Sequence, residues 1–268
     1  MSSYRSAQVE YMPMIRLRDG VPVPGEQALL DAIEAQPGAL WLIGNEPDVK
    51  WQDNVPPDVY AQQYHELYHL LKTQDPSCQV AIGGITQPSP LRLRYLDLIW
   101  EAYQARYGEP MPVDVWNVHN FVLREERDSW GVDIPPGIAE QSGLLLEIDD
   151  HDSLSLFEEQ IVRFRQWMKE RGQQNKPLIV TEYGILMPAD YGFPPERVEA
   201  FMLKTFAFFR TATDPVLGYP ADNFRLVQRW CWYSLADTSY PTGNLLQIET
   251  GEFTSLGEAF RRYAHSQH

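Results

Sequence analysis

The amino-acid sequence predicts one α/β domain built on a parallel sheet, and three observations lead to this prediction. Short apolar stretches alternate with amphipathic stretches along the whole chain, which is the pattern of strands joined by crossover helices. The length of 268 residues suits a single domain with a substantial core, here residues 1–268. No internal repeat or low-complexity tract interrupts the alternation.

The expected elements follow from this alternation, and their order along the chain is strand, then helix. Strands are expected over residues 9–15, 40–44, 79–85, 113–119, 178–181 and 226–233. Helices are expected over residues 25–36, 57–73, 91–107, 153–171, 195–213 and 256–264. The second helix opens on Pro57, which suits a first turn, and it places Tyr60, Tyr64, Leu67 and Leu71 on one stripe. Residues 122–150 should form a long loop.

Two glutamates follow predicted strands directly. Glu46 ends the run LWLIGNE before Pro47, and Glu182 ends the run PLIVTE shortly before Gly184. A carboxylate at the end of a strand is exposed at the rim of the sheet, where α/β barrels place their catalytic groups. Both glutamates are therefore candidate catalytic residues.

The amino-acid composition indicates which kinds of molecule the protein can bind. The chain carries 37 acidic residues against 22 Lys and Arg, with a net charge of -15 and a pI near 4.8. This balance argues against nucleic acid or an anionic membrane as partner. The 8 Trp and 14 Tyr residues offer flat faces with polar edges that suit sugar rings, although most are expected in the core.

Membrane and export signals are not expected in this sequence. No apolar stretch approaches the roughly 20 residues of a membrane span, and the first ten residues lack the apolar core of a signal peptide. As written, the chain reads as cytoplasmic. Cys78 and Cys231 lie in apolar contexts far apart, and two buried thiols are expected more than a disulfide.

Four runs occur in an order that matches a known group of enzymes. GNEPD, VDVWNVHNF, PLIVTEYG and RWCWYSLAD resemble the clan of retaining glycoside hydrolases built on (β/α)8 barrels, and the opening VEYMPMI resembles a strand of hydrolases acting on β-glucan-like polysaccharides. The resemblance implies a TIM-barrel-like fold and cleavage of a β-linked saccharide by double displacement, with a carbohydrate substrate and no cofactor.

The resemblance also implies roles for individual residues. It makes Glu46 the acid/base, Glu182 the nucleophile, and Asn45 a donor to the sugar 2-hydroxyl. His119 would bind sugar or tune a carboxylate, and Trp230 or Trp232 would supply the platform under the cleaved sugar. Tyr183 follows the nucleophile and should point the other way.

One departure from the clan is expected to affect assembly. The clan's barrel has two strands before the one that aligns with residues 9–15, but only eight residues precede it here. The barrel should therefore be incomplete at its N-terminal end, with two unpaired strand edges. We expect a homodimer that covers them through residues 9–18 or 226–233. A second hypothesis is a catalytically impaired, barrel-derived carbohydrate-binding or structural protein.

A third hypothesis comes from HELYH, residues 65–69, which matches the H-E-x-x-H helix of zinc peptidases. At about 100° per residue, His65 and His69 fall on the side of the helix away from the apolar stripe. Residues 70–100 supply no glutamate or histidine as a third ligand. We therefore expect a solvent-facing histidine pair and no metal site.

Overall fold

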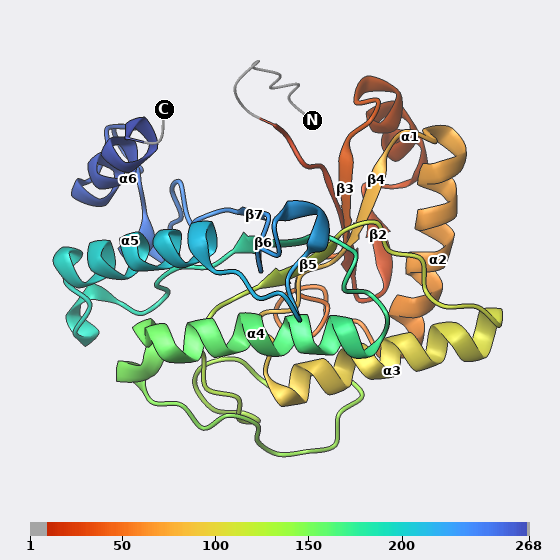
Figure 1. The fold of residues 1–268 in the computed structure, drawn as a ribbon, viewed down its shortest axis with the longest axis horizontal. Coiled ribbons are helices and arrows are strands. Elements are labelled where there is room, and N and C mark those ends of the chain that lie inside the picture. The colour runs from red at the N-terminus through yellow and green to blue at the C-terminus, as the bar shows by residue number, and fades with distance from the viewer. Residues whose placement is uncertain (1–9, 267–268) are drawn as a thin grey trace.

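The computed structural model describes residues 10–266, which form a curved parallel sheet with helices on its outer side (Figure 1). The strands are β1 (Met14–Arg18), β3 (Leu40–Ile43), β4 (Gln79–Ile82), β5 (Trp116–His119), β6 (Leu178–Glu182) and β7 (Arg229–Trp230). Neighbours in this list pair in parallel, and two isolated bridges, Ala81 to Val115 and Ile85 to Val118, connect β4 to β5. All six expected strands are therefore present, in the expected order.

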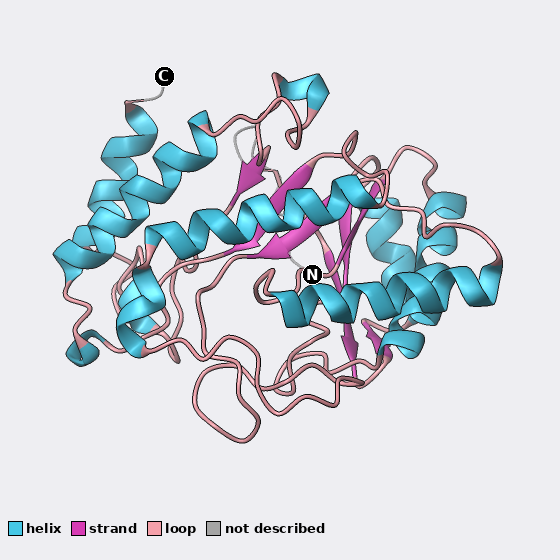
Figure 2. Cartoon of the chain, turned by 60° about the horizontal axis from the view of Figure 1, so that its bottom comes forward, coloured by secondary structure: helices cyan, strands magenta, loops and turns pink. Residues whose placement is uncertain are grey.

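Six helices connect or follow these strands on the outer side of the sheet (Figures 1 and 2). They are α1 (Glu26–Ala35), α2 (Pro57–Gln74), α3 (Pro90–Tyr107), α4 (Leu154–Glu170), α5 (Pro195–Thr211) and α6 (Ser255–His265). Each lies within two residues of its expected bounds. The periodicity of the apolar residues was sufficient to find them, because each helix buries a single stripe against the sheet.

Side chains of each strand point alternately to the two faces of the sheet, and each face has its own apolar core. In β3, Trp41 and Ile43 belong to the large core between sheet and helices, whereas Leu40 and Leu42 belong to a small inner cluster. That inner cluster also holds Ala81, Val115 and Ile179, with Met12 and Met14 packed against it. Successive side chains of a strand point to opposite faces, so the concave face of the sheet has its own apolar filling.

The sheet does not close into a complete barrel within the described residues. β7 pairs with β6 alone, and the free side of β1 pairs with β2 (Val21–Val23) in an antiparallel hairpin. β2 was not expected, although Asp19 and Gly20 form its turn with φ of 48° and 82°, and Asp-Gly is a strong hairpin signal. An exposed ion pair joins Glu10, in the segment before β1, to Arg229 of β7.

Two expectations about the ends of the sheet need correction. The strand expected over residues 9–15 runs from Met14 to Arg18, and residue 9 lies outside the described residues. The strand expected over 226–233 is regular only at Arg229 and Trp230, because a strand paired on one side has fewer hydrogen bonds to hold it. Both cysteines are free, but only Cys78 is buried, since Cys231 follows this edge strand and is exposed.

Residues 122–150 form the long loop that was expected, apart from the start of a short 3-10 helix, η1 (Ile148–Asp152). None of the helices in the described chain is both long and apolar enough to cross a membrane.

Candidate active site

Glu46 and Glu182 meet at the C-terminal rim of the sheet. Glu46 follows β3, and Glu182 is the last residue of β6. The side chain of His119, the last residue of β5, lies between them: its Nδ1 is 2.9 Å from Glu46 Oε1 and 3.7 Å from Glu182 Oε2. One ligand-type atom from each of the three residues lies within 4.8 Å of the other two. Folding has thus joined two carboxylates that are far apart in the sequence.

The backbone at Glu46 is held in an unusual conformation by its neighbours. Its φ is 44°, in the left-handed region that non-glycine residues rarely adopt, and its N–H donates to the carbonyl of Gly84 at 2.9 Å. The buried carboxylate of Asp53 accepts from the N–H groups of Leu17 and Asn45 at 2.8 and 2.7 Å. These bonds fix the turn after β3 and aim Glu46 at the rim.

Asn45 lies beside Glu46 but does not line the cavity at the rim. Its side chain is buried, and its Oδ1 has no hydrogen-bond partner among the described residues. Its expected role toward a sugar hydroxyl stays a prediction.

His119 is fully buried, and its ionisation is set by the two glutamates. Burial lowers the pKa of His119, but the negative charges of Glu182 and Glu46 and the hydrogen bond to Glu46 outweigh burial and raise it to about 9. The ring therefore carries a positive charge at neutral pH and offsets one carboxylate charge. His119 does not line the cavity, and its contacts at the rim are with the two carboxylates.

Gly84 makes room for the His119 ring. A Cβ at this position would lie 2.4 Å from Cδ2 of His119, well inside contact distance. The glycine after β4 is therefore part of the site, since any side chain there would displace the imidazole from the two carboxylates.

Glu182 is the more accessible member of the pair, with a quarter of its side chain exposed. Burial raises the pKa of Glu182, the positive charge of His119 lowers it, and the charge of Glu46 raises it again. The net result is a raised pKa, as expected for two carboxylates that share one cation.

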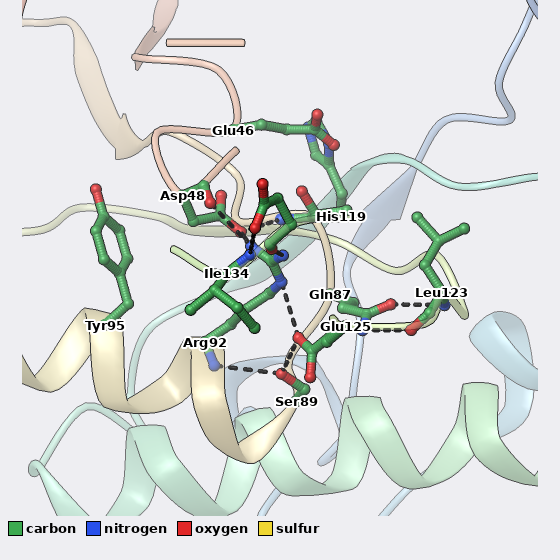
Figure 3. A network of polar contacts seen from close by, with 12 residues as sticks. Glu46, Asp48, Gln87, Ser89, Arg92, Tyr95, His119, Leu123, Glu125 and Ile134 are labelled. Atoms are coloured by element: carbon green, nitrogen blue, oxygen red, sulfur yellow. Dashed lines mark hydrogen bonds and ion pairs between the residues drawn. The ribbon is translucent and has the colours of Figure 1, made fainter. Parts of the chain in front are cut away.

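A buried guanidinium holds the loops behind this pair (Figure 3). Arg92, on α3, donates to a carboxylate oxygen of Asp48 and lies 2.9 Å from Glu125 Oε1 through its Nε, and all three side chains are fully buried. Its Nη2 also donates to the carbonyl of Asp133 at 2.6 Å. Asp48 belongs to the turn after Glu46, whereas Glu125 and Asp133 belong to the long loop. Arg92 therefore ties both segments to one helix.

Gln87 adds a second anchor for the long loop. Its side-chain amide donates to the carbonyl of Leu123 at 3.0 Å and accepts from the Leu123 N–H at 2.8 Å. Leu123 lines the cavity, so this pair of bonds sets one wall of it (Figure 3).

The cavity over the glutamates has a volume of about 620 Å³ and is lined largely by apolar and aromatic residues. Its aromatic members follow β3, β5, β6 and β7, and they are Trp51, Phe121, Trp130, Tyr191, Tyr233 and Tyr240. Four of these six side chains are exposed, those of Trp51, Trp130, Tyr191 and Tyr240. Exposed aromatic rings around carboxylates form the kind of surface on which sugar faces stack.

Trp230 and Trp232, expected as the platform, do not line this cavity. Trp230 packs against Phe206 and Phe209 of α5, and Trp232 packs against Phe201, Phe206 and Tyr183. Trp230 lies in β7 and Trp232 two residues further along, and both side chains face the helices. Tyr183 is buried among the same rings and points away from the cavity, as expected.

The sequence analysis missed the aromatic residues that do line the cavity. Trp51, Trp130 and Tyr240 lie in loops, and Tyr191 ends the short 3-10 helix η2 (Ala189–Tyr191), so no periodicity indicates which way these side chains point. Their positions after the C-terminal ends of β3, β5, β6 and β7 were the available signal, because barrel proteins build their sites from those loops.

Comparison with known proteins now adds to this geometry. No family model matches the sequence, and no curated protein sequence matches it. An endo-β-1,3-glucanase of GH128 subgroup II from Pseudomonas viridiflava superposes with a TM-score of 0.60 over 94% of this chain and 79% of that chain, at 18% identity. The fold is that of the GH128 glucanases.

Two further structures support this assignment of the fold. An exo-β-1,3-glucanase of GH128 subgroup III from Blastomyces gilchristii, in complex with glucose, gives a TM-score of 0.60 at 17% identity, over 97% of this chain and 84% of that chain. A GH128 subgroup I enzyme from Amycolatopsis mediterranei, in complex with laminaritriose, gives 0.60 at 18% identity, over 96% and 83% of the two chains.

The three rim residues also have the side-chain types of metal ligands. Glu46, His119 and Glu182 are close enough together to hold a cation. A metal would bind there only with the imidazole neutral, so its binding would release the proton that the raised pKa of His119 favours.

The HELYH helix, the other candidate metal motif, does not line the cavity and differs from its expected geometry. His65 is half-buried and stacks on Tyr107 with ring centroids 3.7 Å apart, so it is not simply solvent-facing. Glu109, beyond the stretch searched in the sequence, lies close enough to both histidines to act as a third ligand. Glu66 instead accepts hydrogen bonds from Gln62 and Gln63 on the same helix.

We expect Arg92→Met to lower the free energy of unfolding by about 3–5 kcal/mol, because it leaves Asp48 and Glu125 buried without a counter-charge. Arg94→Met, an exposed arginine on the same helix, should change it by less than about 0.5 kcal/mol. Urea unfolding followed by tryptophan fluorescence measures both. Equal effects of the two substitutions would contradict a central role for Arg92.

The ionisation of His119 should also appear in the pH dependence of stability. Its folded pKa of about 9 lies above the ordinary 6.5, so its contribution is complete below pH 6.5 and is lost as pH rises through 9. Over this window the wild type should lose roughly 3 kcal/mol of unfolding free energy that His119→Gln does not lose. Urea unfolding at a series of pH values measures the difference, and parallel curves would contradict it.

Proposed function

We propose that this protein is a retaining glycoside hydrolase that cleaves a β-linked glucan. The observation that carries the proposal is the pair Glu46 and Glu182, with oxygens within 4.8 Å at the base of an aromatic-lined cavity. Retaining enzymes hold their two carboxyl groups about 5–5.5 Å apart, whereas inverting enzymes need roughly 6.5–9.5 Å to admit a water molecule. The closeness of this pair supports double displacement.

The proposed reaction has two steps at one anomeric carbon. A Glu182 oxygen attacks this carbon while Glu46 gives its proton to the departing glycosidic oxygen, which leaves a glycosyl ester on Glu182. Water then attacks the same carbon, gives a proton to Glu46 and releases Glu182. Asn45 donates to the 2-hydroxyl in this scheme, and His119 limits the repulsion between the two carboxylates.

The assignment of the two roles rests on strand order. By resemblance, the acid/base follows the fourth strand of the complete barrel and the nucleophile follows the seventh, which correspond to β3 and β6 here. The raised pKa of Glu182 would by itself suit the acid. Kinetics must therefore distinguish the two assignments.

The substrate class is proposed from the cavity and from the structural neighbours. A net charge of -15 disfavours anionic polysaccharides, and the lining of exposed aromatic rings suits neutral glucose units. The similar GH128 structures are named as β-1,3-glucanases, and one with a glutamate replaced by glutamine holds laminarihexaose. We therefore propose β-1,3-glucan as the substrate.

One observation favours a second candidate, a carbohydrate-binding protein without turnover. Within the described residues, no strand joins β7 to β1, so the rim between these strands has no strand ends to supply sugar contacts. Turnover of aryl β-glucosides separates the candidates, because an activated leaving group needs little help from distant subsites.

If the proposal holds, Glu182→Gln should abolish turnover of both aryl β-glucosides and laminarin. Glu46→Ala should spare substrates with good leaving groups far more than those with poor ones, because such groups depart without protonation. Azide added to Glu46→Ala should be recovered as the β-glycosyl azide. Glu34→Gln, an exposed glutamate of α1, is the control and should be silent. If Glu46→Ala abolished all turnover and Glu182→Gln spared substrates with good leaving groups, the two roles would be exchanged.

We also propose that the open edges of the sheet are covered in a homodimer. The segment before β1 is joined to β7 by the exposed ion pair of Glu10 with Arg229, which contributes little to stability. A two-fold interface at these edges would cover the exposed backbone groups most simply. Sedimentation velocity at micromolar concentration should give about twice the mass of 30.9 kDa. A monomer at that concentration would overturn this proposal without affecting the catalytic one.

A further inference from the structure

We propose that His65, His69 and Glu109 form a binding site for a divalent cation of the zinc class on the outer helices. The site lies apart from the residues that line the cavity and is independent of the proposed hydrolase activity. One ligand-type atom from each of the three side chains lies within 4.8 Å of the others.

The two histidines are brought together by their helical spacing. Residues four apart on a helix lie on the same face, and the ring centroids of His65 and His69 are 4.3 Å apart on α2. The third ligand comes from the end of α3, which packs against α2. Gly108, with φ of 73°, ends α3 in the left-handed conformation and turns the chain so that Glu109 reaches the histidines.

The His65 ring is held in place before any metal binds. It stacks on Tyr107 with planes 6° from parallel, and its Nδ1 is 2.8 Å from the hydroxyl of Tyr103. This contact engages Nδ1, so Nε2 is the nitrogen that remains available to a metal. A hydrogen bond to the second ring nitrogen is the usual support of a metal-bound histidine, since it fixes the tautomer and the ring orientation.

The donor set selects the class of cation. Two imidazole nitrogens and one carboxylate oxygen suit Zn²⁺, with water as a fourth ligand, and are poor ligands for Ca²⁺ or Mg²⁺. Ligand atoms around tetrahedral zinc lie about 3.4 Å apart, from bond lengths of about 2.0–2.2 Å. His69 and Glu109 are exposed, so small side-chain rotations can bring their atoms to that distance.

The geometry indicates a structural site and not a peptidase site. Glu66, the residue that would act as base in an H-E-x-x-H enzyme, is hydrogen-bonded to Gln62 and Gln63 and does not belong to the three-residue cluster. A cation bound by α2 and α3 would instead cross-link the two helices and stabilise the folded state in proportion to its occupancy.

Isothermal titration of the full chain with Zn²⁺, after chelator treatment and dialysis, tests the proposal. We expect one Zn²⁺ per chain, a rise in the thermal midpoint with added Zn²⁺, and at least tenfold weaker binding in His69→Gln and in Glu109→Gln. His265→Gln removes an exposed histidine on α6 and is the matched control, which should bind as the wild type does. Both ligand positions are exposed, so these variants should fold.

Three outcomes would overturn the metal site. They are no binding by the wild type at tens of micromolar Zn²⁺, unchanged binding in both ligand variants, and loss of binding in Glu182→Gln, which would place the cation at the rim of the sheet. Binding retained in Glu182→Gln and lost in His69→Gln supports the outer site whatever the fate of the hydrolase proposal.

Discussion

The buried guanidinium of Arg92 is the constraint on which the architecture of the rim depends. It lies fully buried between two buried carboxylates, Asp48 and Glu125, and each of these belongs to a different loop. A charge without a partner in such a place is costly, so the loops can adopt only conformations that keep the three groups together. The turn that carries Glu46 and the long loop that carries Trp130 are therefore set by one side chain of α3.

At the rim, too, a buried cationic group lies between two carboxylates. Two carboxylates face one imidazole, and the imidazole takes up a proton because burial without it would leave repulsion uncompensated. The result is a site that gathers three titratable groups near the ends of β3, β5 and β6. A hydrolase that must first donate and then accept a proton needs such a site, which makes the same interaction relevant to folding and to the proposed chemistry.

The curved sheet explains why aromatic residues separate into two sets. Rings on the strands that point toward the outside, such as Trp41 and Trp116, fill the space under the helices. Rings in the loops after the strands, such as Trp51 and Trp130, remain exposed around the cavity. Both sets consist of the same residue types, but one set lies on strands and the other on the segments that follow them. An aromatic-rich sequence therefore indicates a sugar site only through the residues that lie beyond the strand ends.

The sequence by itself determined the order and type of the elements, because periodicity of apolar residues is a local property that each strand or helix carries within itself. It also singled out Glu46, Glu182 and His119, which stand at the ends of apolar runs and which the structure brings together. Only the tertiary structure decided that Trp230 and Trp232 face the helices and that Glu109 joins His65 and His69. It also showed that Arg92 and Gly84 support the site. Each of these depends on contacts between segments far apart in the chain, and no local pattern encodes such contacts.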